Sequence, residues 1–144
     1  MSRIQRSALV AHSAARMYAL VNDVAAYPRR FGWCSAAQVL EQDENRLVAR
    51  LDLGFGALHT WFTTENTLSP PRRIEMALRD GPFRRLDGHW EFHALDESAC
   101  KVTLVMDFEP LNRLLGPALE LGFKGLADRM VDDFVRVADG EQVK

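Results

Sequence analysis

The nucleophilic and ionisable side chains of this sequence do not form an arrangement typical of a catalytic centre. The two cysteines, Cys34 and Cys100, lie far apart without CxxC spacing, which excludes a disulfide framework and a zinc ribbon. The chain also has no GxGxxG or P-loop motif, no GxSxG elbow and no HExxH motif. A reactive cysteine needs a neighbouring base or positive field, and nothing in the sequence places one beside either thiol. We therefore predict that the protein has no catalytic residue and is not an enzyme.

One stretch contains residues that could bind a metal ion. His89, Glu91 and His93 alternate along a predicted strand, which puts two imidazoles and a carboxylate on one face. Histidine and glutamate are good zinc ligands. We expect that face to meet solvent, however, and the spacing nominates no further ligand, so we predict no metal site. His12 and His59 are isolated, and we expect them to be surface or capping residues.

Three pairs of adjacent arginines form the strongest basic feature of the chain. They are Arg29–Arg30, Arg72–Arg73 and Arg84–Arg85, and all fall in or beside predicted loops. If the pairs converge at one end of the sheet, they could contact RNA phosphates or an acidic partner. The alternative is an ordinary solvated surface, which the pattern favours. The whole chain carries 18 Lys and Arg against 20 Asp and Glu. Because binding by bulk charge draws on many phosphate contacts, we predict no DNA partner.

The elements that must position these residues begin with a strand and a short helix. Residues 4–10 alternate between apolar and polar types, which predicts a strand. Ser13 is a candidate N-cap for a helix that ends near residue 24. The first 22 residues contain arginines but no acid, a composition shared with transit peptides. Since the same residues carry the strand pattern and the helix pattern, we interpret this segment as part of the fold and not as a transit peptide. Pro28 and Gly32 then predict a loop over residues 27–34.

From residue 36 the period of the apolar positions changes from helical to alternating. Further apolar rows cover residues 47–55, 58–64, 74–78, 86–92 and 100–108. Each row has one apolar and one largely polar face, as in an antiparallel sheet that is covered on one side. A last apolar stripe predicts a long C-terminal helix through Leu115, Leu119, Gly122, Leu126, Met130 and Phe134. Pro117 predicts a break or kink near the start of this helix.

This order of elements predicts an α+β fold, in which a curved antiparallel sheet of about six to seven strands wraps around one long helix. The 144 residues contain no linker or repeat, so we predict a single domain over residues 1–144. No apolar run is long enough to form a transmembrane segment. The cysteine content suits a reducing cytoplasm.

The inward rows carry unusually large side chains, which leaves two interpretations of the interior. Either the aromatic and methionine residues simply fill the core, or the sheet stands off the helix and leaves an apolar cavity for a hydrophobic ligand. The pattern alone favours the filled core. Gly88 and Gly122, both at inward positions, suit either extra room or a close backbone approach.

The chain contains a set of short motifs that are each weak alone. In chain order they are Tyr18-x-x-Val21-x-Asp23-Val24-x-x-Tyr27-Pro28, Trp33-Cys34-Ser35, Phe62-Thr63-Thr64-x-Asn66, Asp80-Gly81-Pro82-Phe83, Trp90-x-Phe92, Asp107-Phe108-Glu109, Phe123-Lys124-x-Leu126 and Met130-Val131-x-x-Phe134. Together they resemble the motifs of the coenzyme Q-binding, START-like family, which includes the bacterial ribosome association toxins. The resemblance implies the helix-grip fold and favours the cavity. It also implies a non-enzymatic protein, without a required cofactor, that binds ubiquinone or a related polyprenyl lipid and supports respiratory electron transfer.

Transferred to this chain, the resemblance implies a ligand-binding wall and a mouth. The implied ligand-binding residues are Tyr27, Trp33, Phe62, Met76, Trp90, Met106, Phe108, Phe123, Met130 and Phe134. Residues 27–34 and 111–123 would form the mouth. Gly32 stands where the family usually has proline, which predicts a more mobile mouth. Gly116–Pro117 interrupts what is normally continuous helix, which leaves the start of the helix open.

The same resemblance implies alternative functions. In the toxin branch, the protein would bind the large ribosomal subunit and block subunit joining, with a small antitoxin as partner. The arginine pairs are then the candidate ribosome-facing residues. A third alternative is a cyclase or hydrolase, because START-like folds host both activities. We expect a cytoplasmic protein, with peripheral association with the inner membrane as a variant for a lipid carrier.

Overall fold

The computed structural model of the protein describes the backbone of residues 2–55, 58–111 and 116–143. Side chains are described over the same ranges except at positions 2, 55, 58, 112–116, 119 and 141–143. The elements are β1 (Ser2–Val10), α1 (Ala14–Asn22), η1 (Val24–Ala26), α2 (Tyr27–Arg30), β2 (Cys34–Gln42), β3 (Arg46–Phe55), β4 (Leu58–Ser69), β5 (Arg73–Asp80), β6 (Phe83–Asp96), β7 (Ala99–Pro110) and α3 (Gly116–Val143).

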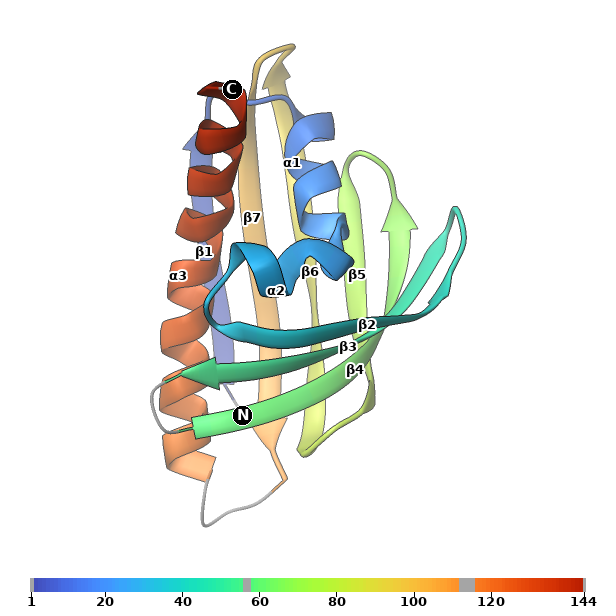
Figure 1. The fold of residues 1–144 in the computed structure, drawn as a ribbon, viewed down its shortest axis with the longest axis vertical. Helices are drawn as coiled ribbons and strands as arrows, with labels where there is room; N and C mark the ends of the chain where they lie inside the picture. The colour runs from blue at the N-terminus through green and yellow to red at the C-terminus, as the bar shows by residue number, and fades with distance from the viewer. Residues whose placement is uncertain (1, 56–57, 112–115, 144) are drawn as a thin grey trace.

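The strands form one antiparallel seven-stranded sheet in the order β1-β7-β6-β5-β4-β3-β2. The sheet is strongly curved: β2, β3 and β4 cross the front of the molecule, while β1, β6 and β7 run nearly along α3 (Figure 1). The long helix α3 packs against β1 and β7 and also contacts α1. The predicted α+β architecture, with a curved sheet around one long helix, is confirmed.

The first residues of the chain are an integral strand, as their alternation predicts. Strand β1 pairs with β7, so that Ile4 lies opposite Met106 and Val10 lies opposite Cys100. Ile4 and Val10 are both buried. The helix that follows is capped by Ser13, whose Oγ accepts a hydrogen bond of 3.1 Å from the backbone N–H of Arg16.

The stretch predicted as a loop over residues 27–34 contains a helical turn. Helix α2 (Tyr27–Arg30) carries Pro28 in its first turn. Proline is tolerated there because the first backbone N–H groups of a helix have no partner within the helix. A break was also expected near Pro117. The described part of helix α3 runs from Gly116 to Val143 and so includes Pro117 near its N-terminal end, whereas residues 112–115, on the other side of the expected break, lie outside the described residues.

The core lies between the concave face of the sheet and the helices. The inward row of β7 is fully buried and consists of Cys100, Val102, Leu104, Met106 and Phe108. Helix α3 contributes Phe123, Leu126, Met130 and Phe134 from its predicted stripe, whereas Leu115 and Leu119 lie outside the described side chains. Gly88 allows close approach and not extra room, because a Cβ there would lie 2.2 Å from the carbonyl oxygen of Val105. Within the described part of the chain, no helix is both long and apolar enough to cross a membrane.

Candidate functional site

A small cavity remains between the sheet and the helices, with a volume of about 50 Å³. Its wall draws on α1, α2 and α3 and on strands β3 to β7. It brings together these members of the predicted ligand-binding set: Tyr27, Phe62, Met76, Trp90, Met106 and Met130. Most of the space between sheet and helix is therefore filled by side chains, as the apolar pattern alone favours.

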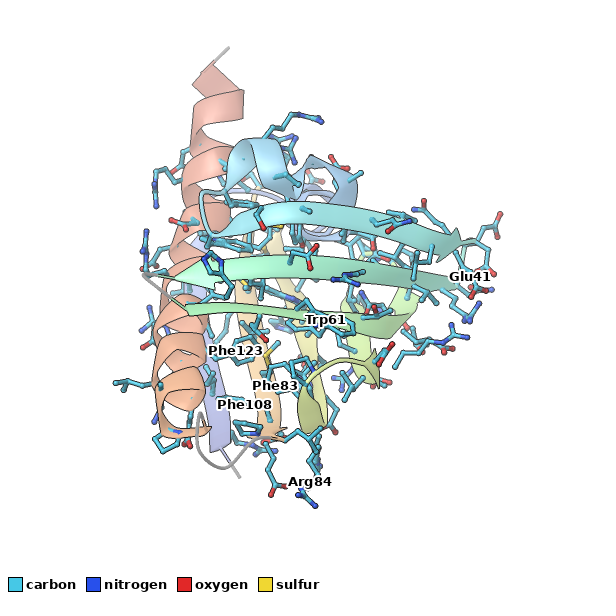
Figure 2. All side chains as sticks on the ribbon, turned by 60° about the horizontal axis from the view of Figure 1, so that its bottom comes forward. Glu41, Trp61, Phe83, Arg84, Phe108 and Phe123 are labelled. Carbon is cyan, nitrogen blue, oxygen red and sulfur yellow. The ribbon has the colours of Figure 1, made fainter. Side chains whose placement is uncertain are left out.

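The other predicted wall residues lie outside this cavity. Phe108 and Phe123 pack edge to face, with ring centroids 4.8 Å apart, in a cluster that also includes Phe83. Figure 2 shows these three rings together near the end of the sheet that carries Arg84. Phe134 packs against Trp90 at 5.4 Å and against Phe31 at 4.8 Å. Ligand contact by these residues stays a prediction.

The cavity wall also contains polar side chains, which the sequence patterns did not nominate as site residues. The Oδ1 atoms of Asn22 and Asn66 are buried without a hydrogen-bond partner in the described protein. Asn66 is only 7% exposed, and Thr64 beside it on β4 is 5% exposed. A signal was available, because Thr64 and Asn66 continue the inward row of Phe62, where apolar residues are expected. Buried polar groups usually have partners, so these two amide oxygens mark a place where a donor is needed.

The cavity offers no acid–base pair for catalysis among the described residues. Tyr27 is the ionisable group in its wall, and its hydroxyl donates a hydrogen bond to the backbone oxygen of Val21. Burial raises the pKa of Tyr27 far above its ordinary value. A neutral phenol that is already committed to a backbone carbonyl is poorly suited to proton transfer.

A larger cleft of about 580 Å³ opens on the outside, where the α2–β2 connection meets α3. We call it the outer cleft; it is lined by Arg30, Phe31, Gly32, Trp33, Gly54, Leu121, Gly122, Gly125, Leu126, Arg129, Asp133, Arg136 and Val137. Figure 1 shows the α2–β2 connection crossing beside α3 at this place. Part of the predicted mouth, residues 27–34, therefore does border an opening. Residues 112–115 of the mouth lie outside the described residues.

Stacked aromatic rings close the floor of the outer cleft. The rings of Phe31 and Trp33 lie 4.8 Å apart at an interplanar angle of 10°. Behind them, Tyr27 packs on Phe31 at 5.5 Å and on Phe134 at 5.5 Å. Asp133 is buried below the rim, where it accepts a hydrogen bond of 2.9 Å from Trp33 Nε1 and pairs with Arg136. The aromatic rings thus stand between the outer cleft and the interior cavity.

The three arginine pairs do not converge at one end of the sheet. Arg72–Arg73 lies at the turn before β5 and Arg84–Arg85 lies just after the turn that follows it, so β5 separates them. Arg84 projects from the edge of the molecule (Figure 2). Arg29–Arg30 lies on α2, in a third place. The ribosome-facing role of these arginines stays a prediction, but they do not make one continuous patch.

The last candidate residues are the histidines of β6 and the two cysteines. The His89 ring lies 4.0 Å from the Glu91 carboxylate, and His93 is exposed. The described residues contain no group of three or more side chains suited to a metal ion. Cys34 and Cys100 are both buried, and burial raises the pKa of the Cys34 thiol to about 11.

One histidine prediction is wrong. His59 is exposed, as expected, but His12 is only 5% exposed. Its Nε2 lies 2.6 Å from Asp139 Oδ1, so it joins the end of β1 to the last turns of α3. The two residues are 127 positions apart, a distance over which spacing carries no signal.

The curved sheet that grips one long helix, with a small cavity between them, is the helix-grip fold of START-like proteins. Residues 10–135 match the family described as polyketide cyclase/dehydrase and lipid transport, and the chain belongs to this family. Within it, the chain is 45% identical over 137 residues to the ribosome association toxin RatA of Pseudomonas aeruginosa, and the match covers 95% of each chain.

More distant matches show how widely the fold is used. The chain is 26% identical over 132 residues to the mitochondrial coenzyme Q-binding protein COQ10 of Drosophila melanogaster, covering 89% of this chain and 54% of that one. The crystal structure of the Zhui aromatase/cyclase from Streptomyces sp. R1128 matches with a TM-score of 0.88 at 18% identity, covering 99% and 96% of the two chains. This likeness shows the fold alone. Both branches of the resemblance, toxin and coenzyme Q-binding protein, are thus found, and the toxin branch is the nearer.

Proposed function

We propose that this protein associates with the bacterial ribosome through the large subunit and hinders the joining of the two subunits. One observation carries the proposal: 45% identity to a ribosome association toxin over 95% of both chains, without a large insertion or missing element. The motifs alone favour ubiquinone binding, with ribosome association as the alternative. The identities to the two kinds of relative, 45% to the toxin and 26% to the coenzyme Q-binding protein, favour ribosome association.

The geometry of the interior also favours ribosome association over ubiquinone binding. The cavity has a volume of about 50 Å³, whereas an apolar cavity that holds benzene measures about 150 Å³. A quinone head group with its polyprenyl tail therefore requires side chains to move. The outer cleft, in contrast, is already open and carries charged groups that a macromolecular partner can reach.

Sedimentation through a sucrose gradient tests the proposal. Purified protein is mixed with isolated large subunits, isolated small subunits, or both under conditions in which they join. We expect the protein to travel with the large subunit and the fraction of joined ribosomes to fall as protein is added. Protein that stays at the top of every gradient, with unchanged subunit joining, would contradict the proposal.

A second candidate function is the binding of a small amphipathic molecule in the cavity. It is favoured by the buried, unpartnered Oδ1 atoms of Asn22 and Asn66, two residues of a mostly apolar cavity wall. A ligand hydroxyl can donate its one hydrogen to one of these oxygens, so the chemistry suits a ligand with hydroxyl groups, such as the reduced, quinol form of a ubiquinone-type lipid. Three methionines in the wall, Met76, Met106 and Met130, have flexible side chains that can make room.

Solvent extraction of natively purified protein, followed by mass spectrometry, tests the second function. A stoichiometric prenylated quinol or quinone would support it. Protein that is extracted empty and also fails to take up added ubiquinol would count against it. A cyclase or hydrolase activity has only the shared fold in its favour, because the cavity lacks an acid–base pair among the described residues.

A further inference from the structure

Most arginines on the surface of this protein are already neutralised by a neighbouring carboxylate. Arg3, Arg46, Arg50, Arg73, Arg79 and Arg85 each lie within 3.2 Å of an Asp or Glu oxygen. Arg136 pairs with Asp133, and Arg6, Arg30 and Arg84 have a carboxylate oxygen at 3.7, 3.4 and 3.8 Å. A guanidinium held in this way presents little net charge to a partner. The arginines that matter for an anionic partner are therefore those without such a neighbour.

Arg129 is an arginine of that kind, and it lies in the outer cleft. It is exposed and forms no ion pair within the described part of the chain. Arg30 and Arg136 line the same cleft. Among the described residues of its wall the acid is Asp133, which is buried and held by Trp33 and Arg136. Arg136 is thus paired, and Arg30 lies 3.4 Å from Asp23, so the net positive charge of the cleft is that of Arg129.

The convex face of the sheet carries a net negative charge. A shallow hollow there is lined by two arginines, Arg3 and Arg73, and by four acids, Glu65, Glu75, Asp87 and Asp107. Its lining carries a net charge of −2, like the whole chain. Since charged surfaces orient a molecule as it approaches a polyanion, RNA is repelled from this face and attracted to the outer cleft.

The shape of the outer cleft also suits a bulky anionic chain. Leu121, Gly125, Arg129 and Asp133 follow one another at intervals of four residues, so they form one row along α3. Gly32 faces them from the α2–β2 connection. A Cβ added at Gly32 or Gly125 would meet nothing within 4 Å, so both glycines border open space. A backbone phosphate can thus come close to α3 beside the Arg129 guanidinium.

We propose that the outer cleft is the RNA-contacting surface of this protein and takes a phosphate-bearing segment of the large subunit's ribosomal RNA. Arg129 binds a phosphate oxygen, and the walls beside it carry Arg30 and Arg136, each next to a carboxylate. The inference rests on the proposed association with the ribosome and names the part of the protein that makes it. It replaces the arginine pairs at residues 72–73 and 84–85 as the principal contact.

A matched pair of charge reversals tests the electrostatic part. Arg129→Glu changes an unpaired arginine inside the outer cleft, and Arg72→Glu changes an exposed arginine, also without an ion pair among the described residues, outside it. We expect Arg129→Glu to weaken binding to purified large subunits at least about tenfold and to lower the salt slope of log Kd by about 1. Arg72→Glu should stay within about twofold of wild type. Equal losses in both variants, or a loss confined to Arg72→Glu, would overturn the proposal.

A second pair tests the shape without changing charge. Gly125→Leu fills the outer cleft, whereas Gly140→Leu adds the same side chain to the same helix outside it. Neither side chain meets a neighbour at its Cβ, so both variants should fold like wild type. We expect only Gly125→Leu to lose subunit binding. Wild-type affinity in Gly125→Leu would show that the cleft is not the contact.

Cross-linking identifies the chemical nature of the partner. Large subunits that contain 4-thiouridine are irradiated with bound protein, and the cross-linked peptides are sequenced. RNA cross-links within residues 30–33 or 121–137 support the proposal, and bound protein that cross-links to RNA only through other residues, or not at all, overturns it. If wild-type protein does not bind subunits at all, the proposed function fails; if it binds and the cleft variants bind equally, only this inference fails.

Discussion

Trp33 Nε1 donates a hydrogen bond of 2.9 Å to Asp133 Oδ2, across 100 positions of sequence. Both side chains are buried, with 6% and 7% of their surface exposed. The bond joins the residue just before β2 to helix α3. Because Trp33 also stacks on Phe31, this one contact fixes the floor of the outer cleft and the position of its buried acid.

Removing the carboxylate of Asp133 should destabilise the fold. In Asp133→Ala the indole N–H of Trp33 stays buried without its acceptor, and such a group costs about 1–3 kcal/mol. Asp133→Asn retains an acceptor and should cost less. Urea unfolding of both variants measures the difference, and Trp33→Phe combined with Asp133→Ala completes a double-mutant cycle. Additive effects in the cycle would show that the two side chains do not stabilise each other.

Two glycine-to-alanine changes should have opposite effects on the free energy of unfolding. A Cβ at Gly88 would lie 2.2 Å from the carbonyl oxygen of Val105 and 2.9 Å from the Cα of Met106, so Gly88→Ala has to push β6 and β7 apart. We expect a loss of about 1–3 kcal/mol or more. Gly125→Ala lies in a helix with open space around it and should gain about 0.5–1 kcal/mol. Thermal unfolding checks both, and a stable Gly88→Ala variant would contradict the close approach.

The fold was predictable because its signals are local and repeated. The alternation of Val102, Leu104, Met106 and Phe108 identifies the buried face of β7 without knowledge of its neighbours. Helical spacing does the same for Met130 and Phe134. The turn of helix at residues 27–30 was missed because Pro28 indicates both a loop and the first turn of a helix. Local sequence does not distinguish the two.

The candidate site was less predictable because it depends on contacts between distant segments. His12 and Asp139 meet across 127 positions, and Trp33 and Asp133 across 100. No rule of sequence spacing predicts a contact between residues so far apart. The volume of the cavity depends on how far the helix stands from the sheet, which large side chains at inward positions indicate only loosely. Asn66 is the exception, since a polar residue in an inward row is visible in the sequence.

Replacing Asn66 by leucine should stabilise the protein and weaken ligand binding in the cavity. The Oδ1 atom of Asn66 is buried without a partner in the described protein, and an apolar side chain of similar size removes that cost. We expect Asn66→Leu to raise the free energy of unfolding by about 1–3 kcal/mol. Thr60 offers a control, because its Oγ1 is also buried and unpartnered but lies outside the cavity wall. Thr60→Val should also stabilise the fold.

The same two variants separate structure from ligand binding. If the cavity takes a quinol, Asn66→Leu should lose it while Thr60→Val keeps it, as measured by extraction and mass spectrometry. Quinol retained by Asn66→Leu at the wild-type level would exclude the amide as its partner. Destabilisation of Asn66→Leu would show instead that the amide is satisfied in the folded protein.

Cys34 should make both the reactivity and the stability of the protein depend on alkaline pH. Burial raises the pKa of its thiol to about 11, from about 8.5 for a free cysteine. At pH 8 the thiolate fraction in the folded protein is therefore lower by roughly 100-fold or more. Iodoacetamide should modify folded protein very slowly at this pH and should modify urea-unfolded protein at the ordinary rate. Rapid modification of Cys34 in folded protein would contradict its burial.

The sign of the stability effect follows from the same pKa difference. The folded state holds the thiol proton more tightly than the unfolded state, so the contribution of Cys34 is complete below the unfolded pKa. It is lost progressively as pH rises from about 8.5 toward about 11. Cys34→Ala removes the titrating group, and its unfolding free energy should fall less between pH 8 and pH 10.5 than that of wild type. Urea unfolding at both pH values compares the two slopes. Cys100→Ala is the companion variant, because the pKa of the buried Cys100 thiol is also raised. Equal slopes in wild type and in both variants would show that neither thiol resists ionisation in the fold.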